Sequence, residues 1–200
     1  MNELRDPRAA GRRAIGATIA IAASLGLLSA VTVAGAAGYA GRDVIGLASL
    51  VFLVALIVGA VIAMRWIYLV ATIAYALSGG ETTRPGWAVG WYFVPFANLV
   101  KPYYAMREIY QVSENPADWP SVPGDYLPMW WGFWIATNIL SNIAQRLDGF
   151  DVGVPAALVI ELLYFGSAAV TAWMFIRLVR EISANLAERI FQRDVAEIFV

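Results

Sequence analysis

The chain has 200 residues, of which 60% are hydrophobic and 14% are charged, and its mean hydropathy is +0.64. A water-soluble domain of this length has no core large enough to cover so many apolar side chains, so the composition predicts an integral membrane protein. A net charge of −1 excludes an overall basic field for nucleic acid, and the lack of Cys and His excludes disulfides, thiolate chemistry, imidazole metal sites and histidine bases.

Four apolar segments each have the roughly 20 residues that a helix needs to cross the hydrocarbon. They cover residues 14–37, 44–64, 126–145 and 154–176, and they predict an all-α fold, a four-helix membrane bundle in one domain. The second segment stays apolar after Arg65, so its helix has two predicted ends, near residue 64 or near residue 78. Because the longer helix exceeds the bilayer thickness, we expect it to project into the cytoplasm under the cover of residues 79–125 and the tail.

The first segment carries small residues at every fourth position. Such a ridge lets another helix approach closely, either from the same bundle or from a second copy of the chain. Arginines precede this segment as in a secretory signal, but its apolar run is longer than a signal's, which favours a retained span. The ridge consists of Ala14, Thr18, Ala22, Gly26, Ala30, Ala34 and Gly38.

The positive charges predict an orientation. Twelve of the 14 Lys and Arg residues lie before the first segment, between the second and third, or after the fourth; only Arg42 and Arg146 lie in the other two loops. Positive charge collects on the cytoplasmic side, so both termini and residues 79–125 are expected there. We also expect the indoles near this membrane surface to lie in the interface, namely Trp66, Trp130, Trp131 and Trp173.

The connection over residues 79–125 is too interrupted by prolines to span the membrane. From Pro102 it has a helical pattern, with an apolar face of Leu99, Tyr103, Met106 and Tyr110 and a polar face of Arg107, Glu108, Gln111 and Glu114. This pattern predicts an amphipathic helix in the cytoplasmic membrane interface, its polar face in water. A belt packed under the bundle and a docking face for a partner are the alternatives. Residues 177–200 form an amphipathic helical tail in the cytoplasm.

One spaced set of residues in this connection carries a family resemblance. It is flanked by "RWIY" at residues 65–68 and "WWGFWIATNILSN" at residues 130–142, and it comprises Trp87, Trp91, Pro95, Asn98, Leu99, Pro102, Met106 and Arg107. Over about residues 45–185 the chain resembles a bacterial membrane family, catalogued as domain of unknown function 4328. The resemblance implies a multi-helix inner-membrane protein and supplies no chemistry. Residues 69–77 depart from it, because they are apolar where such proteins look more polar.

Polar residues within the predicted spans are the candidates for a site. Asn138, Asn142 and Gln145 share a stripe on the third segment, and Glu161 and Tyr164 share one on the fourth. Since the two helices are antiparallel neighbours, we expect the stripes to meet. They then form either a hydrogen-bonded packing site or a site for a cation, a proton or a small polar ligand.

Two classes of function remain from the sequence. The first is a non-enzymatic scaffold or accessory subunit of a membrane complex in the bacterial inner membrane, with the lipid bilayer and a protein partner or second copy as its contacts. The alternative is a small transporter or channel component that uses the cluster around Glu161. No enzyme, cofactor, metal or nucleic acid is predicted, because Glu161 has no nucleophile or metal ligand beside it in the sequence.

Overall fold

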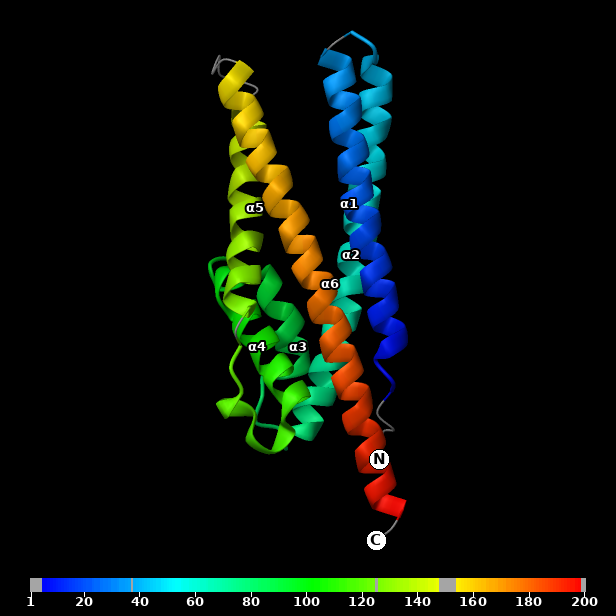
Figure 1. Cartoon of the computed structure of the whole chain (residues 1–200), viewed down its shortest axis with the longest axis vertical. Helices are drawn as coiled ribbons and strands as arrows, with labels where there is room; N and C mark the ends of the chain where they lie inside the picture. Colours follow the sequence, from blue (N-terminus) through cyan, green and yellow to red (C-terminus); the bar gives the residue numbers. More distant parts are fainter. Residues whose placement is uncertain (1–4, 37, 125, 148–153, 199–200) are drawn as a thin grey trace.

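A computed structural model describes residues 5–36, 38–124, 126–147 and 154–198. These residues are helical with no strand among them, which confirms the all-α class (Figure 1). The elements are α1 (Arg8–Ala36), α2 (Arg42–Leu77), α3 (Pro85–Gly90), η1 (Trp91–Phe93), η2 (Ala97–Leu99), α4 (Lys101–Glu114), η3 (Pro116–Ser121), α5 (Leu127–Leu147) and α6 (Val154–Ile198), the three η elements being 3-10 helices.

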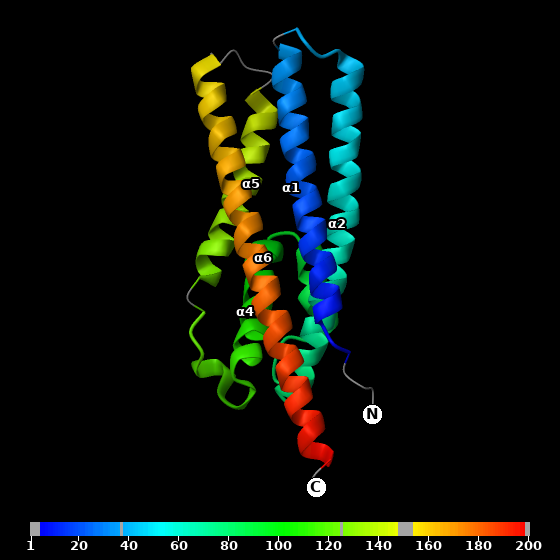
Figure 2. The same cartoon turned by 45° about the vertical axis from the view of Figure 1, so that its right-hand side comes forward.

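The long helices form two hairpins, α1 with α2 and α5 with α6, which diverge away from the chain ends (Figures 1 and 2). Small residues let α1 and α2 pack closely: a Cβ on Gly59 would lie 2.5 Å from the Cδ1 of Ile21. The hairpins join where α1 packs against α6. The contacts of α5 are with α6 and α4, so mutual packing of four helices along their length is not confirmed.

Three helices are long and apolar enough to cross a membrane, over Arg8–Gly35, Arg42–Leu77 and Val159–Arg193 among the described residues. They correspond to the first, second and fourth predicted segments. The third is helical as α5 but is not one of the three. Helix α1 begins at Arg8 rather than at residue 14, and α2 runs unbroken to Leu77, the later of its two predicted ends.

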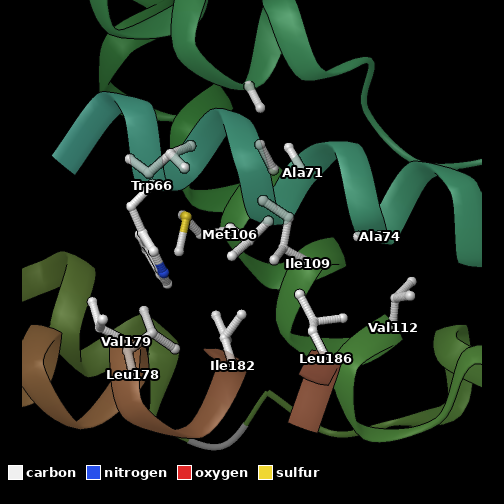
Figure 3. Packing of buried hydrophobic residues seen from close by; sticks show 14 of the residues in the cluster. Trp66, Ala71, Ala74, Met106, Ile109, Val112, Leu178, Val179, Ile182 and Leu186 are labelled. Carbon is white, nitrogen blue, oxygen red and sulfur yellow. The ribbon is translucent and has the colours of Figure 1, made fainter. Parts of the chain in front are cut away.

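The apolar end of α2 lies in a protein core. We call this part of the molecule the cap: residues 66–122 and the α6 residues 174–190. In Figure 3, Trp66 on α2, Met106 on α4 and Ile182 on α6 point toward one another. Val70 and Ile73 on α2 are also fully buried, with α4 on one side and α6 on the other. The cap thus covers the part of α2 that is too long for the bilayer.

The core of the cap agrees with one prediction for the helix that follows Pro102, the belt packed under the bundle, and corrects another. Met106 and Ile109 on α4 are buried against α2 and α6. Gln111, predicted to face water, is 4% exposed, because the following loop folds back over it and its Nε2 donates to the carbonyl of Val122 at 2.6 Å. Helix α4 is therefore an internal helix of the cap.

The indoles expected in the membrane interface also lie mostly in protein. Trp66, Trp130 and Trp131 are buried, and of the four only Trp173 is exposed. The Nε1 of Trp66 donates to the Oγ of Ser183 at 3.0 Å, which ties α2 to α6 inside the cap. The indole N–H of Trp131 also has an acceptor, the carbonyl of Leu99, whereas that of Trp130 is buried without a hydrogen-bond partner among the described residues.

The predicted tail is the continuation of the fourth segment, since α6 is one helix of 45 residues. Its apolar residues Ile182, Leu186 and Ile190 are buried in the cap. At about 1.5 Å per residue this helix is roughly 67 Å long, more than twice the thickness of the hydrocarbon. It links the membrane-crossing part of the molecule to the cap without a break.

Candidate functional site

Helix α5 has one polar face that is satisfied within the protein. The Oγ1 of Thr137 hydrogen-bonds the Oγ of Ser167 at 3.0 Å and lies 3.3 Å from the Oγ1 of Thr171, both on α6. One turn further on, the hydroxyl of Tyr164 hydrogen-bonds Ser141. These hydroxyl pairs hold α5 against α6 and fix the antiparallel register of the hairpin.

A second face of α5 is open and forms a groove of about 540 Å³, the α5 groove. Its apolar and polar groups come from successive turns of α5 and from the η2 segment. The lining consists of Asn98, Leu99, Trp134, Ile135, Asn138, Ile139, Asn142, Ile143 and Arg146. The groove therefore combines the two asparagines of the stripe predicted on α5 with two residues of the family motif, Asn98 and Leu99.

Asn138 and Asn142 are both exposed in the groove, and each turns one amide hydrogen back onto its own helix. The Nδ2 of Asn138 donates to the carbonyl of Trp134 at 2.7 Å, and that of Asn142 donates to the carbonyl of Asn138 at 2.8 Å. Neither carboxamide oxygen has a hydrogen-bond partner among the described residues. Each side chain retains two acceptor lone pairs and a second N–H for a group that enters the groove.

The other residues of the predicted polar cluster lie elsewhere. Tyr164 faces α5 from α6 through its bond to Ser141, and extending that register by one turn places the half-buried Glu161 beside Ala144. No hydrogen bond among the described residues joins Glu161 to Asn138 or Asn142. Gln145 lies on α5, but its side chain falls outside the described residues. The structure thus brings the two asparagines together and leaves Tyr164 on another side of α5.

The family-motif residues organise the segment that borders the groove. The rings of Trp87 and Trp91 stack with centroids 4.4 Å apart, and the Nζ of Lys101 lies 5.7 Å from the centroid of Trp91. Pro102 and Met106 are buried in the cap. Of the remaining members, Pro95 is exposed, the half-buried Asn98 and the exposed Leu99 line the groove, and Arg107 lies beside Gly124.

Sequence reasoning missed the link between this segment and α5. The Nε1 of Trp131 donates to the carbonyl of Leu99 at 2.8 Å, and the ring of Trp131 stacks on that of Trp134 at 4.4 Å between centroids. The bond attaches η2 to the first turns of α5 and so sets the end wall of the groove. The Trp-rich run at the start of α5 was the available signal, but nothing in it identifies a carbonyl as the partner.

Two exposed aromatic residues near the groove were also missed. Phe93 is 73% exposed and Phe96 is 86% exposed, one on either side of Pro95. Phe96 has a φ of 63°, which a bulky residue rarely adopts. The loop between η1 and η2 therefore presents apolar rings outward beside α5.

The cap holds a set of charged contacts that the sequence did not predict. Glu181 accepts a short hydrogen bond from the hydroxyl of Tyr126 and one from the Nε of Arg177 at 2.7 Å. On the other side, Asn185 donates to Glu114 at 2.6 Å. The Tyr126 contact ties α6 to the chain that leads into α5, and the Asn185 contact ties α6 to α4. Among the described residues, no group of three Asp, Glu, His or Cys side chains is placed to hold a metal ion.

Comparison with known proteins gives a family. The profile of a domain of unknown function (DUF4328) matches residues 29–184, which include residues 66–122 of the cap, α5 and most of α6. No curated protein and no solved structure matches the chain.

Proposed function

The chain belongs to the family defined by a domain of unknown function (DUF4328), and from that premise we propose that it is a non-enzymatic scaffold or accessory subunit of a membrane complex. In this proposal the α5 groove receives a transmembrane helix of a partner protein. The observation that carries it is the pair of exposed asparagines, Asn138 and Asn142, whose carboxamide oxygens have no partner in the described chain. In hydrocarbon such oxygens cost free energy until another polar group reaches them.

The proposal requires α5 to lie in the membrane as a fourth span. Its 21 residues extend for roughly 31 Å, which matches the hydrocarbon thickness. Its partner in the hairpin, α6, contains one of the three candidate spans, and the hydroxyl pairs between them lie within that length. The less apolar composition of α5 is what a helix needs when one face packs on protein rather than on lipid.

The orientation follows the charges. We place both termini and the cap in the cytoplasm of a bacterium and the divergent ends of the hairpins on the outer side of its inner membrane. Cysteines introduced at Gly41 and Glu81 test this placement, because the chain has no Cys of its own and both positions are exposed. An impermeant thiol reagent added to intact cells should label position 41 alone. Labelling at position 81 would reverse or abolish the proposed topology.

The lining of the groove favours binding over catalysis. Its polar side chains are three amides and the guanidinium of Arg146, and none of these is an effective nucleophile or general base at neutral pH. Amides instead bridge helices within membranes, where each hydrogen bond contributes about 0.6 kcal/mol on average. Several such bonds spread over two turns of α5 would select a partner helix by its polar pattern.

Photo-crosslinking tests the occupant directly. A benzophenone amino acid replaces Ile139, which lines the groove and is 54% exposed, or Val54, which is 52% exposed on α2. In native membranes, position 139 should cross-link to one protein at high yield and position 54 mainly to lipid. Cross-links from position 139 to lipid alone would contradict the proposal. Cross-links to a second copy of the chain would make it a homo-oligomer.

A pair of double variants tests whether the carboxamides of Asn138 and Asn142 are needed for binding the partner helix. Asn138→Leu with Asn142→Leu should abolish the cross-link from position 139. Ser49→Leu with Thr32→Leu is the matched control, since both hydroxyls are exposed and bond a carbonyl four residues earlier in their own helices. Equal loss in both double variants would mean that polarity in general, and not the groove, decides assembly.

The exposed ridge of α1 supports association of this hairpin as well. Ala22, Gly26 and Ala30 are exposed, and a Cβ on Gly26 would meet nothing within 4 Å. The close packing of α1 on α2 uses other residues, such as Ile21. The middle of the small-residue ridge is thus uncovered within the part of the chain that the structure describes, whereas Ala14 at its start is buried in the core.

A small transporter or channel component is the second candidate. The observation in its favour is Glu161, a half-buried carboxyl group within a candidate span. Proteoliposomes that contain the protein should show proton or cation flux in this case, and Glu161→Gln should remove it. Absence of flux from the wild-type protein would eliminate this candidate and leave the scaffold.

A further inference from the structure

Helices α1 and α6 cross near the chain ends at a point that only a glycine allows. A Cβ on Gly11 would lie 2.5 Å from the Oγ of Ser183 and 3.1 Å from its Cβ. Ser183 is held in place by the hydrogen bond from Trp66. Figures 1 and 2 both show the first turns of α1 lying against α6.

This crossing creates a second groove, of about 190 Å³, that shares no residue with the α5 groove. Its floor is apolar, from Gly11, Ile15, Val179 and Ala184. Its rim carries three arginines, two from successive turns of α1 and one from α6. They are Arg8, Arg12 and Arg180.

The three arginines are exposed and have no carboxylate partner in an ion pair among the described residues, where Glu181 pairs with Arg177. The carboxylates nearest in sequence have other partners: Glu181 is bound by Arg177 and Tyr126, and Asp6 accepts a hydrogen bond from the backbone N–H of Arg8 at 2.8 Å. Close packing of α1 on α6 therefore gathers like charges around one small groove. Their mutual repulsion falls when an anion binds between them.

The position along the helices is that of the phospholipid headgroups. Arg8 and Arg12 directly precede the uncharged run that begins at Ala14, and Arg180 follows Arg177 at the end of the apolar part of α6. Ile15 and Val179 lie on the side of the groove nearer the bilayer centre. A ligand that fits has an anionic group at the arginines and an apolar part over Ile15 and Val179.

We propose that the groove between α1 and α6 binds the phosphate of an anionic phospholipid, with Arg8, Arg12 and Arg180 around the phosphate oxygens. Guanidinium groups suit this role because their donors match phosphate geometry. Basic pockets between membrane helices at the cytoplasmic surface bind headgroups in this way. The apolar floor distinguishes a lipid from free phosphate, which has nothing to place there.

The test is a lipid titration of the purified full-length protein in maltoside micelles, with the rise in Tm used to rank the affinities. Dioleoylphosphatidylglycerol should bind more tightly than dioleoylphosphatidylcholine. Replacing all three arginines by Gln should lower the affinity for phosphatidylglycerol by about fivefold per residue, or about 100-fold in total. Phosphatidylcholine binding should change little.

The matched control removes the same charge elsewhere. Arg13, Arg65 and Arg84 are exposed and do not line the groove, so their triple replacement by Gln should keep the preference for phosphatidylglycerol. If the protein with all three rim arginines replaced does not fold, Arg180→Gln alone should still lower the affinity for phosphatidylglycerol by about fivefold.

Three outcomes would overturn the proposal. The wild type would show no preference for the anionic lipid, or the control triple would lose the preference as fully as the rim triple. In the third, inorganic phosphate at equal concentration would raise Tm as much as the lipid does, and the groove would then be a site for a free anion. None of these results depends on whether a partner occupies the α5 groove.

Discussion

Helix α2 passes through two regions that contrast although its composition hardly changes. Between Leu47 and Val61 its large side chains are mostly exposed, with only α1 beside them, whereas Val70 and Ile73 are fully buried in the cap. Lipid solvates the first half, and protein surrounds the second. The same apolar sequence is therefore held in place by the bilayer in one region and by a packed core in the other.

The comparison teaches where the stability of the fold resides. In lipid, apolar side chains gain nothing from touching protein instead of hydrocarbon, so packing and hydrogen bonds decide helix association. In the cap, burial removes apolar surface from water, at about 25 cal/mol per Å². Substitutions should thus be costly in the cap and mild on the exposed face of the hairpins.

The sharpest test uses one residue type in one helix. Ile73→Ala removes a fully buried side chain from the cap and should lower the free energy of unfolding by about 2–5 kcal/mol. Ile57→Ala, at a position 56% exposed, should cost less than about 0.5 kcal/mol. Denaturation by SDS in mixed micelles measures both. Equal costs would mean that α2 has a single environment along its length.

A smaller effect is expected from a hydrogen bond within the cap. Ser183→Ala leaves the buried N–H of Trp66 without its acceptor and should cost about 1–3 kcal/mol. Ser49→Ala removes an exposed hydroxyl that bonds only its own helix, and Tm should stay within a degree or two of wild type. A neutral Ser183→Ala would show that water replaces the hydroxyl and that the core at this crossing is not dry.

A substitution where the cap meets α5 should lower the free energy of unfolding by less. Trp131→Phe removes the donor to the carbonyl of Leu99 and should cost about 1 kcal/mol. It should also lower the cross-linking yield from position 139, since η2 would no longer be attached to α5. Trp173→Phe, at an exposed indole, is the control for both measurements. An unchanged yield in Trp131→Phe would separate the groove from the cap.

The smallest effects on stability are expected in the hairpin of α5 and α6. Thr137→Val loses the contacts to Ser167 and Thr171 and should cost about 0.6 kcal/mol, the average for a hydrogen bond between membrane helices. Glu161→Gln keeps shape and hydrogen-bonding capacity and should leave Tm unchanged. A drop comparable to that of Ile73→Ala would show that an amide cannot replace the carboxyl group in the packing of this hairpin.

The sequence predicted the helices because their signals are local. Runs of apolar residues set the positions of the long helices, and Pro102 marked the start of α4 within one residue. The apolar stretch after Arg65 also predicted that α2 would need cover. These inferences need only helix length and the thickness of the bilayer.

The predictions that were wrong concern contacts between helices and loops that lie far apart in the sequence. Met106 has the same helical pattern whether its face meets lipid or α6, and only the return of α6 through the cap decides between them. Gln111 looked solvent-facing because the loop that covers it comes later in the chain. The stripes of α5 and α6 were predicted at the same depth, yet Asn138 lies in the groove while Tyr164 contacts Ser141. Adjacent residues of a helix are about 100° apart around its axis, so Asn142 and Ser141 belong to different faces of α5.

The unbroken α6 has a consequence for synthesis. Leu178, Ile182 and Leu186 complete the cap, but they emerge from the ribosome after its core residues on α2 and α4, including Val70 and Met106. The nascent chain therefore carries an uncovered apolar end of α2 while its later helices are still being inserted. The cap can therefore close only after the last membrane helix has been synthesised. A chain stalled before Leu178 would expose the apolar end of α2 to chaperones and proteases.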